Sequence, residues 1–230
     1  MTNQTRTDQP GPGAARRISH EQRWPAAAAI IVVVIILHFL PQRVRLLPVW
    51  APYALSGAMV LSMLGVSLSK GAQRWRQIER VVILSLVSLS VVNMLIILAE
   101  MIRTLALHAT EFNGIVLFAS SVALWATNVL YFSLIYWLID RGGPEARLSE
   151  GGSLPDWRFP QDDGAADVAP GWRPVFMDYL FLAYSTATAF SPTDASPLTR
   201  RAKALMMLQS TISLLTLVVV ASRAINILGN

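Results

Sequence analysis

Hydroxyl and carboxylate side chains gather in a short stretch near the C-terminal end of the chain. The candidates for a polar constriction are Thr186, Thr188, Ser191, Thr193 and Asp194. Hydroxyl groups and freed carbonyls close to a helix end can replace part of the water shell of an ion. The same residues suit an ordinary turn, in which Asp194 or Ser196 caps the following helix. The stretch therefore indicates either an ion constriction or a connecting turn.

The helix expected after this turn, over residues 202–228, has one polar face. Gln209 precedes Ser213 by four residues, and Ser213 precedes Thr216 by three, so the three side chains share that face. A pore lining requires a polar face. Helix packing uses one equally well, because such groups hydrogen-bond between membrane helices for about 1 kcal/mol or less. The pattern leaves both interpretations open.

Three charged residues, Asp178, Arg223 and Glu100, lie within or beside apolar segments. Ionisable groups at membrane depth are costly and often functional, although Asp178 also suits a hydrated position among lipid headgroups. Arg223 is near the end of the last helix, where its long side chain can reach the interface or pair with an acid. Glu100 precedes Arg103 by three residues and can pair with it.

The composition is that of an integral membrane protein. Of 230 residues, 53% are hydrophobic and 14% are charged, whereas soluble domains carry about 25% charged residues. The mean hydropathy is +0.47. A net charge of +5 in such a chain sets membrane topology and does not point to nucleic acid.

Catalytic and metal-binding patterns are weak throughout the sequence. The chain has no cysteine, and its three histidines are far apart, so we expect no metal and no cofactor. No nucleophile, base and orienting acid occur at a recognisable spacing, and there is no phosphate-binding glycine loop. We therefore expect that the protein is not an enzyme.

Apolar runs divide the chain into four parts. Residues 1–23 are polar and are expected to be a disordered cytoplasmic N-terminus. Residues 24–139 are expected to hold four transmembrane helices, over 24–40, 52–68, 81–98 (with an extension toward 107) and 114–138. Residues 140–174 form an acidic loop rich in Gly and Pro, held against the membrane surface by Trp157, Phe159 and Trp172. Residues 175–230 combine a short amphipathic helix, a turn and the final transmembrane helix.

The short helix over residues 177–190 either re-enters the membrane or spans it. Re-entry gives an all-α integral membrane protein with five transmembrane helices plus a pore-like helix, and it keeps nearly all Lys and Arg on the cytoplasmic side. Spanning gives six transmembrane helices and brings Asp178 and Arg223 toward the same face, where they could pair. We favour the five-span arrangement, with the N-terminus in the cytoplasm.

The last part resembles the pore module of two-helix potassium channels. Thr186-Ala187-Thr188 ends the short helix, and Asp194-Ala195-Ser196-Pro197-Leu198-Thr199 is similar to the Asp-x-Ser/Thr-Pro-x-Thr run that follows the potassium filter. Where that family has Thr-Val-Gly-Tyr-Gly, this chain has Ala189-Phe190-Ser191-Pro192-Thr193. The resemblance implies the shape of a pore module, without the glycines that let successive carbonyls face a pore.

The second half also resembles an uncharacterised bacterial inner-membrane family of unknown function. Three motifs carry this resemblance: Tyr131-Phe132-Ser133-Leu134-Ile135-Tyr136, Trp157-Arg158-Phe159-Pro160 and Phe176-Met177-Asp178-Tyr179-Leu180. The resemblance implies a multi-pass protein of the bacterial inner (plasma) membrane and no established activity.

Three functions fit these observations. The first is an ion-channel-like pore protein of unknown selectivity, a homo-oligomer in the lipid bilayer that passes monovalent ions. The second is a non-conducting membrane protein that uses the pore-module shape for packing or partner binding. The third is a small-solute carrier.

Overall fold

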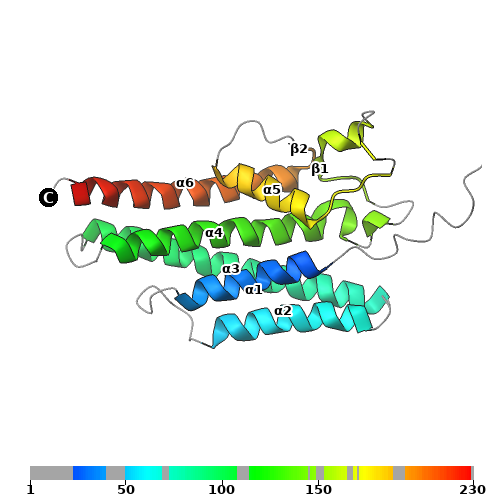
Figure 1. Cartoon of the computed structure of the whole chain (residues 1–230), viewed down its shortest axis with the longest axis horizontal. Helices are drawn as coiled ribbons and strands as arrows, with labels where there is room; N and C mark the ends of the chain where they lie inside the picture. Colours follow the sequence, from blue (N-terminus) through cyan, green and yellow to red (C-terminus); the bar gives the residue numbers. More distant parts are fainter. Residues whose placement is uncertain are drawn as a thin grey trace, which may run out of the picture.

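The protein is all-helical apart from one very short strand pair (Figure 1). The computed structural model describes residues 23–39, 50–68, 73–107, 114–144, 146–148, 153–164, 168–169, 171–188 and 195–228. Its helices are α1 (Trp24–Phe39), α2 (Ala51–Leu68), α3 (Gln73–Leu107), α4 (Gly114–Ile139), α5 (Phe176–Thr188) and α6 (Arg200–Leu228). The strands β1 (Trp157–Arg158) and β2 (Ser196–Pro197) pair antiparallel, and the single turns η3 (Asp140–Gly142), η4 (Ala146–Leu148) and η5 (Pro160–Asp163) lie between α4 and α5. The predicted all-α class is confirmed.

Three helices are long and apolar enough to cross a membrane, by length and composition. The candidate spans are Gln77–Arg103, Ile115–Gly142 and Arg200–Ala221. Trp24–Phe39 and Tyr53–Ser62 are shorter apolar helices within α1 and α2. Several apolar helices in one chain make this a multi-pass membrane protein in contact with lipid.

The start of α3 differs from the prediction. The charged stretch before residue 81 was expected to be a loop, but α3 already begins at Gln73. Arg80 donates from Nη1 to the carbonyl of Gly142 at 2.9 Å, and Arg23 pairs with the buried carboxylate of Glu79 at 3.1 Å. Charged side chains therefore find protein partners on this turn, and hydropathy alone places the helix start too late.

These contacts define one end of the bundle, which we call the charged end. The pair between Arg23 and Glu79 joins the start of α1 to the start of α3, and the Arg80 bond joins α3 to the end of α4. At the opposite end, His38 of α1 hydrogen-bonds to the hydroxyl of Tyr53 of α2 at 2.5 Å. Successive helices α1 to α4 therefore run in alternating directions, and α4 finishes at the charged end (Figure 1).

Helices α5 and α6 both begin at the charged end and run in the same direction (Figure 1). The strand pair aligns Trp157 with Pro197, just ahead of α6. Further along, Gln209 donates to the carbonyl of Ala183 at 2.7 Å, and Ser210 donates to the carbonyl of Thr186 at 3.2 Å. Thr188 therefore lies farther from the charged end than Ala195, and residues 189–194 lie outside the described residues.

Helix α4 forms the centre of the bundle. Half of its apolar span is buried inside the protein, compared with 28% for α6. Phe132, Leu134, Tyr136 and Trp137 have no exposed surface. Polar groups enclosed in this way must find partners inside the protein, and Thr127 donates to the carbonyl of Ala123 at 2.7 Å.

The aromatic residues of the long loop were predicted to lie against the membrane surface, but Trp157 and Phe159 are buried inside the protein. Trp157 is 0% and Phe159 is 5% exposed. Trp172 is partly buried, with its ring 5.9 Å from that of Phe159. The expectation was wrong because the rings of α4 and α5 offer an apolar protein surface, which a local sequence pattern does not reveal.

Candidate functional site

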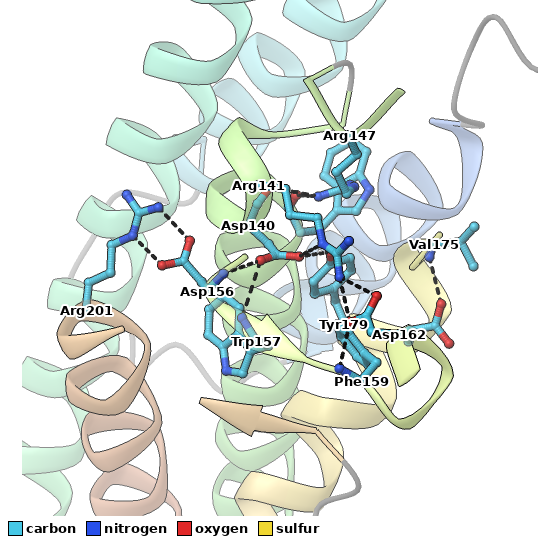
Figure 2. Close-up of polar contacts among 12 residues, drawn as sticks. Asp140, Arg141, Arg147, Asp156, Trp157, Phe159, Asp162, Val175, Tyr179 and Arg201 are labelled. Carbon is cyan, nitrogen blue, oxygen red and sulfur yellow. Dashed lines mark hydrogen bonds and ion pairs between the residues drawn. The ribbon is translucent and has the colours of Figure 1, made fainter. Parts of the chain in front are cut away.

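A buried carboxylate marks the point where α4 ends. Asp140 is 0% exposed. Its Oδ1 accepts hydrogen bonds from the backbone N–H of Asp156 at 2.7 Å and of Trp157 at 3.4 Å, and its Oδ2 accepts one from the Tyr179 hydroxyl at 2.5 Å (Figure 2). One side chain thus connects α4, the long loop and α5. The Nε of Arg141 lies 3.5 Å from the same carboxylate.

The local sequence explains why the chain leaves the helix here. Arg141, Gly142 and Gly143 all have positive φ, at 53°, 83° and 103°. Glycine adopts such angles without the clash that a Cβ would cause. At Gly143 a Cβ would lie 3.1 Å from the carbonyl oxygen of Leu138. The glycine pair therefore lets the chain leave α4 just after Ile139, with the Asp140 side chain inside the protein.

A second buried carboxylate connects the loop to α6. Asp156 is 0% exposed, and it accepts from both Nε and Nη2 of Arg201 at 2.6 Å. It also accepts from the Thr199 hydroxyl at 2.5 Å, and its carbonyl accepts from the Leu198 N–H at 2.8 Å. Two parallel bonds from a guanidinium to a carboxylate combine charge with fixed geometry. The start of α6 is therefore attached to the residues that contact Asp140 (Figure 2).

A buried arginine covers the end of α4. Arg147 is 4% exposed and donates from Nη1 to the carbonyls of Trp137 at 2.7 Å and Asp140 at 3.3 Å. Its guanidinium carbon lies 5.0 Å from the centre of the Tyr179 ring. A cation is favourable at both places, because the last carbonyls of a helix carry partial negative charge and so does the face of an aromatic ring.

We call Asp140, Arg147, Asp156, Tyr179 and Arg201 the Asp140 cluster. Aromatic rings surround it: Tyr136 and Trp157 lie 4.7 Å apart, Phe159 and Tyr179 5.5 Å, and Trp137 and Phe176 6.0 Å between ring centres. The three motifs on which the bacterial-family resemblance rests therefore meet here. The arrangement fixes the ends of α4, α5 and α6, and among the described residues no three metal-ligating side chains come together.

Sequence inspection did not select any member of the Asp140 cluster as a site residue. A signal was present, because Asp140 follows an apolar helix directly and precedes two glycines, and Asp156 and Arg158 flank Trp157. Charged residues alternating with aromatic ones are a poor fit to a hydrated loop. The distance of at least 16 residues between Asp140 and its partners Asp156 and Tyr179 hides the contact from any local pattern.

The predicted polar face of α6 lies inside this chain. Gln209 is 0% exposed, donates to the Ala183 carbonyl at 2.7 Å and accepts from the Tyr136 hydroxyl at 2.6 Å. Asn128 of α4 donates to the Ser213 hydroxyl at 2.9 Å. Thr216 is 1% exposed and bonds to its own helix, at the carbonyl of Ile212. Within one chain this face joins α6 to α4 and α5.

The predicted constriction is only partly within the described residues. Thr186 is buried and donates to the Leu182 carbonyl at 2.7 Å, and Thr188 is half-buried and donates to the Tyr184 carbonyl at 2.9 Å. Ser191, Thr193 and Asp194 lie outside the described residues. A role of these five residues in a constriction stays a prediction.

The three charged membrane candidates lie far from one another. Glu100 and Arg103 form the predicted pair at 3.0 Å on an exposed face of α3. Asp178 is half-buried in the first turn of α5 and accepts from the Val175 N–H at 2.7 Å, and burial raises the pKa of its carboxyl. Arg223 is in the last turns of α6, about 35 Å along that helix from the charged end. The six-span alternative considered a pair between Asp178 and Arg223. That pairing is wrong within one chain, because parallel α5 and α6 hold the two residues near opposite ends of the bundle. The Arg223 side chain lies outside the described residues.

No family model, no curated protein and no solved structure matches this chain. The class of protein that the fold defines is a multi-pass membrane protein with several apolar helices. Its function is therefore inferred from its own residues.

Proposed function

We propose that α5 is a re-entrant helix in a membrane protein with five transmembrane helices. The supporting observation is the parallel course of α5 and α6 from the charged end. In addition, α5 has 13 residues, or about 20 Å, which is short for a hydrocarbon core about 30 Å thick. A helix that spans would deliver the chain to the opposite end of the bundle before α6 begins.

The charged end is proposed to face the cytoplasm. Among the described residues, the following cations belong to segments at that end: Arg23, Arg80, Arg141, Arg147, Arg158, Arg173, Arg200, Arg201 and Lys203. Arg103 and Arg223 belong to helix ends at the other side. Loops rich in Lys and Arg stay in the cytoplasm, which also places the N-terminus there.

Single-cysteine labelling tests this topology, and the chain contains no cysteine that would have to be removed first. Val175→Cys and Ser196→Cys flank α5, and both positions are exposed. Both should react with a membrane-impermeant maleimide in inside-out vesicles only, whereas Phe39→Cys, at the opposite end of the bundle, should react in intact cells. Labelling of Val175→Cys and Ser196→Cys from opposite sides would establish six spans and exclude re-entry.

On this arrangement we infer an ion-conducting pore protein built from several copies of the chain. The order of a short entering helix, a return and a long parallel helix is the order of a pore loop and inner helix. One chain supplies one such unit, so a central pore requires a homo-oligomer. Because Gln209 and Ser213 are bonded inside the chain, the proposed constriction is assigned to the end of α5 and residues 191–194.

Ion flux into liposomes tests the pore. The purified protein is reconstituted, and potassium, sodium and chloride flux is compared with that of Thr188→Val and Asp194→Ala. Thr127→Val is the matched control, because Thr127 also donates to the carbonyl four residues earlier but lies in α4. We expect altered flux for Thr188→Val and Asp194→Ala, wild-type flux for Thr127→Val and unchanged oligomer size for all three.

Two results would decide against this assignment. Equal flux in all variants of a conducting preparation would refute the constriction site. Absence of flux for all three ions, from folded and oligomeric protein, would refute the open pore.

A non-conducting membrane protein is the second candidate. It is favoured by the hydrogen bonds of Gln209 to Ala183 and Tyr136, which use the polar face of α6 for packing. In that case substitution of Gln209 changes stability and leaves flux at the level of empty liposomes.

The small-solute carrier receives less support. A cavity between α1, α2, α3 and α4 is lined in part by Ser56, Ser90, Asn93 and Tyr131, but its volume is about 30 Å³. That volume suits water and not a solute of several heavy atoms. Saturable uptake of a solute by the reconstituted protein would reverse this ranking.

A further inference from the structure

A cavity of about 70 Å³ lies between η5, α5 and Ala195. Its polar lining consists of Gln161 from η5 and of Asp178 and Ser185 from α5, and Ala195 lies on its wall. Asp178 and Ser185 are seven residues apart, two turns of one helix, so the cavity follows α5 inward for about 10 Å from the charged end.

Among the described residues, no cation forms an ion pair with the carboxylate in this cavity. Asp178 accepts a hydrogen bond from the Val175 N–H at 2.7 Å, and no Lys, Arg or His among the described residues forms an ion pair with it. The other carboxylates nearby differ in this respect, because Asp162 pairs with Arg141 at 2.6 Å and Asp163 pairs with Arg158. The Val175 N–H and the N-terminal end of α5 stabilise this half-buried charge in part, and a bound cation would relieve the remaining cost of burial.

We propose that this cavity binds one monovalent inorganic cation, with Asp178 supplying the charge. The amide group of Gln161 lines the same cavity, and the volume leaves room for water molecules that complete the shell between the carboxylate and the Ser185 hydroxyl, about 10 Å further along α5. A divalent ion fits less well, because protein sites for Ca²⁺ usually combine several carboxylates, and Asp178 is the one carboxylate in the described lining of this cavity. The described residues contain no group of three acidic or histidine side chains that could hold one.

The site also has a defined place in the proposed pore. It opens at the charged end and leads along α5 toward Ser185, next to the proposed constriction. Its role as a waiting position for an entering ion rests on the proposed function, whereas cation binding itself does not require conduction.

Cation-dependent stability of the purified full-length protein in detergent tests the binding. The melting temperature is followed by tryptophan fluorescence in sodium, potassium or choline chloride at equal ionic strength. Sodium or potassium should raise the melting temperature of the wild type in a saturable manner, and choline, which is too large for the cavity, should not. Anything that binds the folded state selectively stabilises it in this way.

Two variants and one control locate the effect. Asp178→Asn keeps an oxygen for the Val175 N–H but removes the charge, and it should raise the half-saturating cation concentration at least about tenfold, equivalent to about 1.4 kcal/mol. Ser185→Ala keeps the charge and removes a polar group from the inner part of the cavity, so a smaller increase is expected. Asp163→Asn makes the same charge change on an exposed loop residue outside the cavity and should behave as wild type.

Two outcomes would overturn the proposal: equal melting temperatures in all three salts, or a wild-type response of Asp178→Asn. These outcomes are separate from failure of the pore. Cation-dependent stability without flux refutes conduction and leaves the site, whereas flux without cation-dependent stability refutes the site and leaves conduction.

Discussion

Replacement of Asp140 with asparagine should lower the free energy of unfolding by about 3–5 kcal/mol. The Asp140 carboxylate is fully buried and accepts from the Tyr179 hydroxyl and from the N–H groups of Asp156 and Trp157. Asparagine has nearly the same shape, but one acceptor oxygen becomes an NH₂ group that faces donors. Hydrogen bonds to a charged group contribute about 1.5–3 kcal/mol each, and loss of one partner from a buried charged network costs about 3–5 kcal/mol.

The assay is unfolding of the purified protein in mixed micelles by increasing SDS, followed by tryptophan fluorescence, with Trp157 as a buried reporter beside the Asp140 cluster. Asp163→Asn is the matched control. Asp163 pairs with Arg158, and both side chains are more than half exposed. An exposed pair of this kind contributes about 0–1 kcal/mol, so the control should unfold close to wild type.

A double-mutant cycle separates the Tyr179 contact from the rest of the cluster. Tyr179→Phe alone should cost about 1–2 kcal/mol, and the Asp140→Asn and Tyr179→Phe effects should be non-additive because the two groups share one hydrogen bond. If Asp140→Asn costs no more than Asp163→Asn, or stabilises the protein, the assignment of Asp140 as the residue that fastens α4, the loop and α5 is refuted.

Two further substitutions test the helix contacts. Gln209→Leu should cost about 1–2 kcal/mol in the same unfolding assay, because it leaves the buried Ala183 carbonyl and Tyr136 hydroxyl without their partner. A wild-type unfolding midpoint would show that the contact of α6 with α4 and α5 does not depend on the amide. Glu100→Gln should change stability by less than about 1 kcal/mol, since the pair with Arg103 is exposed, and a larger loss would indicate that this face of α3 is buried in an assembly.

The positions of the helices could be predicted closely from local sequence. The apolar runs predicted helices over 114–138 and 202–228, and the structure has Gly114–Ile139 and Arg200–Leu228. The short helix predicted over 177–190 is Phe176–Thr188. Hydropathy and its end signals are properties of neighbouring residues, so a single sequence reveals them. The predicted start at residue 81 was less accurate, because charged residues at a helix end look like a loop.

The sequence by itself therefore determined an all-helical membrane protein, the approximate bounds of its helices and the i,i+3 pair of Glu100 and Arg103. Only the tertiary structure decided which surfaces meet. It turned the polar face of Gln209 toward α4 and α5, buried Trp157 and brought Asp140 to Tyr179, 39 residues away. Local patterns indicate that a buried polar side chain needs a partner. Segments far apart in sequence supply that partner, and the positions of these segments depend on how all the helices pack together.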